Sequence, residues 1–102
     1  MKLIVFTRRS CQPCQMFTPI LLQMIDEGYE IDIQMTENES AITKAKQYGI
    51  RSVPTTLFMH EDQEVFRFSG YIPKHKLIEA LEKVKDYGPI TNGSDSTGGT
   101  GE

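Results

Sequence analysis

The chain has 102 residues, of which 38% are hydrophobic and 25% charged, with 11 basic and 14 acidic side chains. This length allows one domain and leaves no room for a second independent core. Residues 91–102 contain no apolar side chain, and without them the balance is 11 basic to 12 acidic, which excludes nucleic-acid binding through bulk positive charge. We predict one folded domain over residues 1–89 and a flexible Gly/Ser/Thr-rich tail over residues 90–102.

The beginning of the chain shows no pattern typical of export. Its apolar run, Leu3–Phe6, is too short for the core of a signal peptide and is followed by two arginines. No apolar stretch approaches the roughly 20 residues that span a bilayer. Two cysteines are also too few for the disulfide framework of a small secreted domain. We therefore expect a cytoplasmic protein with no membrane partner.

Hydrophobic periodicity divides the chain into strands and helices. The first half predicts a strand at residues 2–7, a helix at 12–27, a strand at 29–35 and a helix from Asn38 or Ser40 to Tyr48. The second half predicts a strand at residues 55–59, a polar turn at 61–64, a strand at 65–68 and a helix that Pro73 opens. The order β-α-β-α-β-β-α favours an α/β fold with a four-stranded mixed sheet flanked by three helices.

The motif that carries chemistry is C-Q-P-C at residues 11–14, where the first strand leads into the first helix. Active sites collect at the carboxyl edge of such sheets. Cys11 is expected at the helix N-terminus, where backbone N–H groups and the helix dipole stabilise a thiolate. Cys14 lies one turn further on, and Pro13 stiffens the intervening turn. The spacing favours reversible dithiol–disulfide exchange.

Three other interpretations of the cysteine pair remain open at this point. A zinc site needs four ligands, and His60 and His75 lack the usual spacing, so we expect no metal. A static structural disulfide is unfavourable in a cytosolic chain and would close a very small loop. The third interpretation is a chance pair of inert cysteines.

Four segments resemble the thioredoxin family. The motif at residues 11–14 is similar to the family's C-G-P-C, and residues 16–21 are similar to its helix with a kinking proline. Residues 48–55, Y-G-I-R-S-V-P-T, closely match the family segment that contains a cis-proline, and Gly70 matches the glycine after the hairpin. The resemblance extends over about residues 2–86, and it implies the thioredoxin-like fold in a minimal form.

The resemblance also implies how the site works. Cys11 attacks a disulfide, Cys14 resolves the mixed disulfide, and Pro54 forms a cis peptide bond facing both cysteines. An extended substrate segment pairs with the backbone at Val53. The residues implied in turn support and docking are Gln12, Pro13, Val53, Pro54, Gly70 and Tyr71.

The function implied is that of a protein-disulfide reductase in electron transfer and redox homeostasis of the cytoplasm. Such an enzyme binds no cofactor and cycles a redox-active Cys11–Cys14 disulfide. Its partners would be disulfide-containing proteins and an electron donor, either a thioredoxin reductase-like enzyme or glutathione. We expect a monomer that binds no nucleic acid.

The sequence departs from the family at three places near the site. Ser10 and Thr7 stand where tryptophans are usual, and Val5 replaces the buried aspartate, so the acceptor for the Cys14 proton is open. The compact outline is similar to glutaredoxin, which makes a glutathione-dependent reductase the alternative. Residues 70–74 lack the second glycine and the aspartate of the glutaredoxin signature. A non-redox binding subunit with the same fold is a further alternative.

Overall fold

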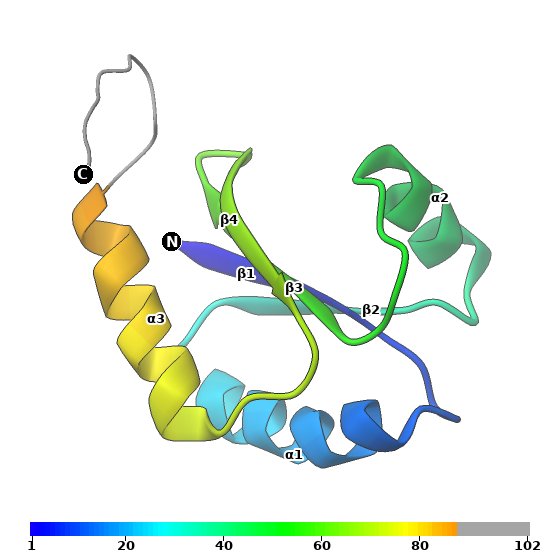
Figure 1. Cartoon of the computed structure of the whole chain (residues 1–102), viewed down its shortest axis with the longest axis horizontal. Helices are drawn as coiled ribbons and strands as arrows, with labels where there is room; N and C mark the ends of the chain where they lie inside the picture. The colour runs from blue at the N-terminus through cyan, green and yellow to red at the C-terminus, as the bar shows by residue number, and fades with distance from the viewer. Residues whose placement is uncertain (88–102) are drawn as a thin grey trace.

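A computed structural model describes residues 1–87 of the chain (Figure 1). The elements are β1 (Lys2–Thr7), α1 (Gln12–Asp26), β2 (Ile31–Met35), α2 (Glu39–Gln47), β3 (Thr55–His60), β4 (Gln63–Ser69) and α3 (Lys74–Tyr87). The predicted order of strands and helices is therefore confirmed. The tail predicted at residues 90–102 lies outside the described residues.

The four strands form one mixed sheet in the order β2-β1-β3-β4. Strand β1 pairs in parallel with β2 and antiparallel with β3, and β4 pairs antiparallel with β3 at the edge. The parallel crossover from β1 to β2 contains α1, as a βαβ connection requires. Residues Leu3–Thr7 are buried because β1 has a strand on each side and helices over both faces.

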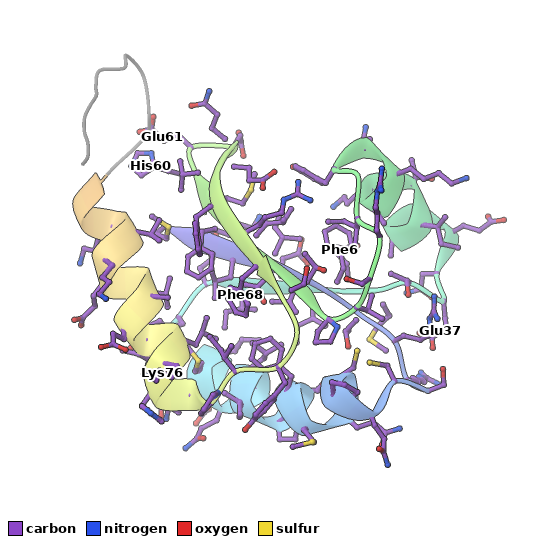
Figure 2. All side chains as sticks on the ribbon, viewed as in Figure 1. Phe6, Glu37, His60, Glu61, Phe68 and Lys76 are labelled. Carbon is purple, nitrogen blue, oxygen red and sulfur yellow. The ribbon has the colours of Figure 1, made fainter. Side chains whose placement is uncertain are left out.

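Alternation along the strands divides the core into two clusters, one on each face of the sheet. The cluster beneath α1 and α3 contains Leu3, Val5, Phe17, Leu21, Met24, Phe58, Leu77 and Val84. The cluster beneath α2 contains Ile4, Phe6, Leu57 and Met59. Figure 1 shows α1 and α3 covering one face and α2 the other, and Figure 2 shows Phe6 on the side of α2.

The predicted hairpin turn at residues 61–64 is too long. The structure confines it to Glu61 and Asp62, which both have positive φ, 50° and 67°. Strand pairing resumes at once, so Gln63 pairs with His60 and β4 begins two residues before the predicted strand. Polar residues are tolerated at this end of β4 because it is an edge strand with a solvated side.

Other predicted boundaries shift by one or two residues: α2 ends at Gln47 instead of Tyr48, β3 at His60 instead of residue 59, and β4 at Ser69 instead of residue 68. Strand β2 begins at Ile31 instead of residue 29, and α1 ends at Asp26 instead of residue 27. Helix α3 begins at Lys74, so Pro73 precedes its first residue. Within the described residues, no helix combines the length and the apolar character needed to cross a membrane.

Candidate active site

A short loop carries the chain from the end of β1 into α1, and hydrogen bonds hold it on two sides. The Arg9 amide donates to Glu37 Oε2 at 2.8 Å, and Gln15 Nε2 donates to the Arg9 carbonyl at 2.7 Å. Figure 2 shows Glu37 beside this loop. The loop is thereby fixed both to the segment after β2 and to the first turn of α1, which determines where Cys11 lies.

Cys11 occupies the N-cap of α1. Its backbone is extended, and its Sγ accepts a hydrogen bond from the Cys14 amide at 3.2 Å. Sulfur therefore takes the role that a serine or aspartate oxygen has at most helix starts. The predicted position of Cys11 at a helix N-terminus is confirmed. The arrangement directs the backbone N–H of Cys14 at the Cys11 sulfur, at the positive end of the helix dipole.

Cys14 lies in the interior, with 1% of its surface exposed, whereas Cys11 is partly exposed. No disulfide joins the two cysteines in this structure. Burial and, to a lesser degree, the contact with Cys11 raise the pKa of Cys14. The Thr7 side chain and the Arg8 backbone N–H act in the opposite direction, since each hydrogen-bonds the Cys14 sulfur and lowers that pKa.

The segment before β3 faces the cysteines from across the sheet edge. The Val53–Pro54 peptide bond is cis, as the resemblance implies, and the Cys11 thiol lies 3.6 Å from the Val53 carbonyl oxygen, to which it donates. The Gly70 amide donates to the Pro54 carbonyl at 2.7 Å, which ties the end of the hairpin to the same place. The nucleophile and the cis-proline turn are therefore in direct contact.

The remaining predicted site residues surround this contact. Gln12 and Pro13 are exposed in the first turn of α1. Tyr71 follows Gly70 and is 38% exposed, and its ring packs edge-on against Phe17 with centroids 6.0 Å apart. Cys11 Sγ itself contacts the Cys14 amide and the Val53 carbonyl, Gly70 is joined to the adjacent Pro54, and Tyr71 reaches α1 through Phe17.

Comparison with known proteins finds thioredoxins, the family that the sequence motifs resemble. A family model described as a thioredoxin-like domain matches residues 1–85. The thioredoxin of Chlamydia trachomatis is 33% identical over 81 residues, which cover 79% of each chain. Thioredoxin 1 of Synechococcus elongatus is 34% identical over 85 residues, covering 79% of this chain and 77% of that one.

The chain belongs to the thioredoxin-like family. With its cysteine pair it is a thiol–disulfide oxidoreductase. The solved structure of Fasciola hepatica thioredoxin is similar with a TM-score of 0.67, at 28% identity over 79% of this chain and 77% of that one. Thioredoxin 1 of Thermosipho africanus superposes with a TM-score of 0.70 over 85% of this chain and 97% of that one, and at 18% identity it shows the fold alone.

Within this thioredoxin-like site, sequence reasoning missed the role of Thr7 toward Cys14. The family comparison marks Thr7 only as the replacement of a tryptophan. A usable signal was present, because Thr7 alternates with Val5 and therefore faces the same side of the sheet as α1. His60 and His75 take no part in the site, and the described residues contain no group of three or more potential metal ligands.

Proposed function

We propose that this oxidoreductase reduces disulfides of protein substrates, with Cys11 as the attacking thiolate and Cys14 as the resolving one. The observation that carries the proposal is the unequal placement of the two sulfurs. Cys11 is partly exposed and accepts an N–H hydrogen bond, whereas Cys14 is buried one helical turn away. A substrate sulfur can reach the first and not the second.

In the first step the Cys11 thiolate attacks one sulfur of the substrate disulfide. A Cys11–substrate disulfide forms, the substrate S–S bond breaks, and the other substrate sulfur leaves as a thiolate that takes a proton from water. The Cys14 N–H, at 3.2 Å, stabilises the attacking anion before the bond forms. The cis-proline turn limits the approach because the Val53 carbonyl lies against the sulfur.

In the second step Cys14 loses its proton to water and attacks Cys11 Sγ. The Cys11–Cys14 disulfide forms and the second substrate thiolate leaves, so the substrate gains two electrons and the enzyme loses two. Burial opposes the deprotonation of Cys14, and the hydrogen bonds from Thr7 and Arg8 partly offset it. The step is therefore expected to depend on pH well into the alkaline range.

Substrate docking uses the exposed groups that surround the sulfur. An extended segment pairs with the backbone at Val53, beside Pro54, and contacts Gly70 and Tyr71. Gln12 and Pro13 form the opposite margin. Tyr71 is suited to this role, since its ring is fixed against Phe17 and still offers an exposed apolar face.

The cycle closes when a donor dithiol reduces the Cys11–Cys14 disulfide. A thioredoxin reductase-like enzyme or glutathione supplies these electrons, and no bound cofactor takes part. We place the protein in the cytoplasm as a monomer, where a reducing thiol pool keeps both cysteines available.

The test is reduction of a disulfide-bonded protein, with dithiothreitol or a thioredoxin reductase as donor. We expect wild type to accelerate the reaction and Cys11→Ser to lose the acceleration entirely. Equal rates for the two proteins would refute the enzymatic proposal.

The order of attack has its own test. Cys14→Ser is expected to accumulate mixed disulfides at Cys11, which mass spectrometry detects as covalent adducts. The opposite result would be adducts on Cys14 in the Cys11→Ser variant and none on Cys11 in the Cys14→Ser variant. It would reverse the assignment of the attacking and resolving sulfurs.

A further inference from the structure

A groove of about 420 Å³ adjoins the nucleophile on the side of α2. Its walls come from the loop after β1, from α2 and from the segment that leads to β3. The residues that define it here are Arg8, Lys46, Arg51, Ile42, Ile50 and Val53. The last of these is the residue whose carbonyl oxygen lies 3.6 Å from Cys11 Sγ, so the groove and the reacting sulfur share Val53 as a neighbour.

The groove is positively charged. It has three cations, Arg8, Lys46 and Arg51, and none of its described lining residues is acidic. None of the three cations forms an ion pair within residues 1–87. Glu37 follows the lining residue Thr36, but its carboxylate accepts the Arg9 amide instead.

A second groove shows that this concentration of charge is local. It has about 390 Å³ and lies at the opposite end of β1, where Lys2 and Lys44 stand among four acidic residues, Glu30, Asp32, Glu61 and Asp62. Lys44 and Lys46 are close together on α2, yet they line different grooves. In a nearly neutral body, this groove therefore combines three cations that have no ion pair among residues 1–87 with no acidic lining residue.

We propose that the groove beside Cys11 binds an acidic segment flanking the reactive cysteine of protein substrates. A disulfide engaged at Cys11 must place its flanking residues along Val53, and from there the chain can enter the groove. Carboxylates would meet the three cations, while apolar side chains would contact Ile42 and Ile50. This inference rests on the proposed function and adds a substrate class to it.

A protein segment fits these features better than a small disulfide such as glutathione disulfide. The cations come from three separate segments of the chain, spread along a groove with apolar residues between them, which suits an extended acidic peptide. The segment at residues 70–74 also lacks the second glycine and the aspartate that the glutaredoxin signature requires.

The experiment compares two disulfide-bonded peptides that differ only in residues flanking the cysteine, Glu in one and Gln in the other. Wild type should reduce the Glu peptide with the higher kcat/KM. Lys46→Gln should lower the Glu-to-Gln ratio of kcat/KM about 1.5- to 5-fold, as expected for one exposed charge pair. The preference should also shrink between 50 and 500 mM salt, because the charges are solvent-accessible.

Lys44→Gln is the matched control, since it removes the same charge from the same helix but lies in the other groove. An equal fall of the ratio in both variants would overturn the proposal, because the effect would then come from net charge. Glutathione disulfide is the third substrate. Lys46→Gln could lower kcat/KM for glutathione disulfide as much as it lowers kcat/KM for the Glu peptide. That result would assign the groove to small anionic disulfides and overturn the choice of a protein segment.

A binding measurement separates this proposal from the proposed function. The Glu and Gln peptides are made with serine in place of cysteine and titrated against Cys11→Ser while backbone amide NMR shifts are followed. Stronger binding of the Glu peptide, with shifts at Ile50–Val53 that Lys46→Gln weakens, supports the groove even if wild type reduces neither disulfide. Equal binding of both peptides overturns the groove even if wild type is an active reductase.

Discussion

The helices that cover the two faces of the sheet are held by very different numbers of buried side chains. We call the face covered by α1 and α3 the firmly anchored face. Beneath α1 and α3 the core cluster has eight buried residues, and α1 contributes three of them, Phe17, Leu21 and Met24. Beneath α2 the cluster has four buried residues, all from β1 and β3, and the only buried residue of α2 is Ala41. Burying one large apolar side chain stabilises a fold by about 1.5–3 kcal/mol, so α1 is held much more firmly than α2.

The difference places the dithiol and the proposed acidic-segment groove in parts of the molecule that are held unequally. Both cysteines belong to the start of α1, which needs fixed geometry because Cys14 must reach Cys11. Lys46 and Ile42 belong to α2, where side chains can change with little effect on the core. Substrate preference can therefore vary on one face while the dithiol stays in place on the other.

The largest expected effect comes from the firmly anchored face. Phe17→Ala should lower the free energy of unfolding by about 3–5 kcal/mol, because it empties a fully buried site one turn beyond Cys14. Urea denaturation measures the loss. Phe17→Leu, expected to cost less than about 1.5 kcal/mol, keeps the prediction measurable if the alanine variant does not fold.

The matched change on the other face is Ala41→Gly in α2. It should cost only about 1–2 kcal/mol, from helix propensity and one lost methyl group. If Ala41→Gly destabilised the protein as much as Phe17→Ala, the comparison of the two faces would be wrong.

An intermediate effect is expected at Thr7, which hydrogen-bonds the resolving cysteine Cys14. The pKa of Cys14 is already raised from its ordinary value of 9.0, so below pH 9 its thiolate is a minor species that increases with pH. Thr7→Val removes a hydrogen bond that lowers this pKa, so the pKa should rise further. Release of substrate from the mixed disulfide should then slow about 2- to 10-fold at neutral pH, as for one lost hydrogen bond.

Stopped-flow measurement of the release step against pH gives the test. The pH at which the release rate increases should be higher for Thr7→Val than for wild type. Thr7→Ser should restore the wild-type pH profile because it keeps the hydroxyl. A Thr7→Val profile that is lower but not displaced along the pH axis would indicate a packing defect instead.

The smallest expected effect concerns an ion pair that joins the two helices on the firmly anchored face. Lys74 Nζ lies 2.6 Å from Glu27 Oε2, which links the end of α1 to the start of α3. Glu27→Gln should lower the free energy of unfolding by about 0.2–1 kcal/mol at low salt and by less at 0.5 M salt. Glu79→Gln is the control, since its pair with Lys76 is longer, at 3.8 Å, and more exposed. Equal losses in the two variants would show that the link between helices contributes nothing specific.

The sequence predicted the fold well where burial is continuous. Strand β1 has the predicted bounds because an unbroken run of β-branched and aromatic residues fits a central strand. The prediction from sequence was wrong at the hairpin, because Gln63 and Glu64 are typical turn residues but belong to the edge strand β4. Ile25 follows the buried Leu21 by four residues, a spacing that predicts burial, yet it is 40% exposed, because periodicity alone cannot show how far a neighbouring helix extends.

For the candidate site too, some features could be predicted from the sequence and others could not. Cys11 at the helix start followed from spacing and from general physics, whereas the cis bond at Pro54 followed only from the family resemblance. The contact of Thr7 with Cys14 and the meeting of Arg8, Lys46 and Arg51 in one groove depend on tertiary packing. Alternation with Val5 places Thr7 on the side of the sheet that faces α1, but no local pattern in the sequence shows which residue of another segment it contacts.

The burial of Cys14 has a kinetic consequence. Because its sulfur is enclosed, donor and substrate both exchange electrons through Cys11 Sγ in the proposed cycle, and each would use the surface around Val53. The two partners therefore cannot be engaged at once. Turnover becomes a ping-pong cycle in which each partner, when in excess, competes with the other for the same form of the enzyme.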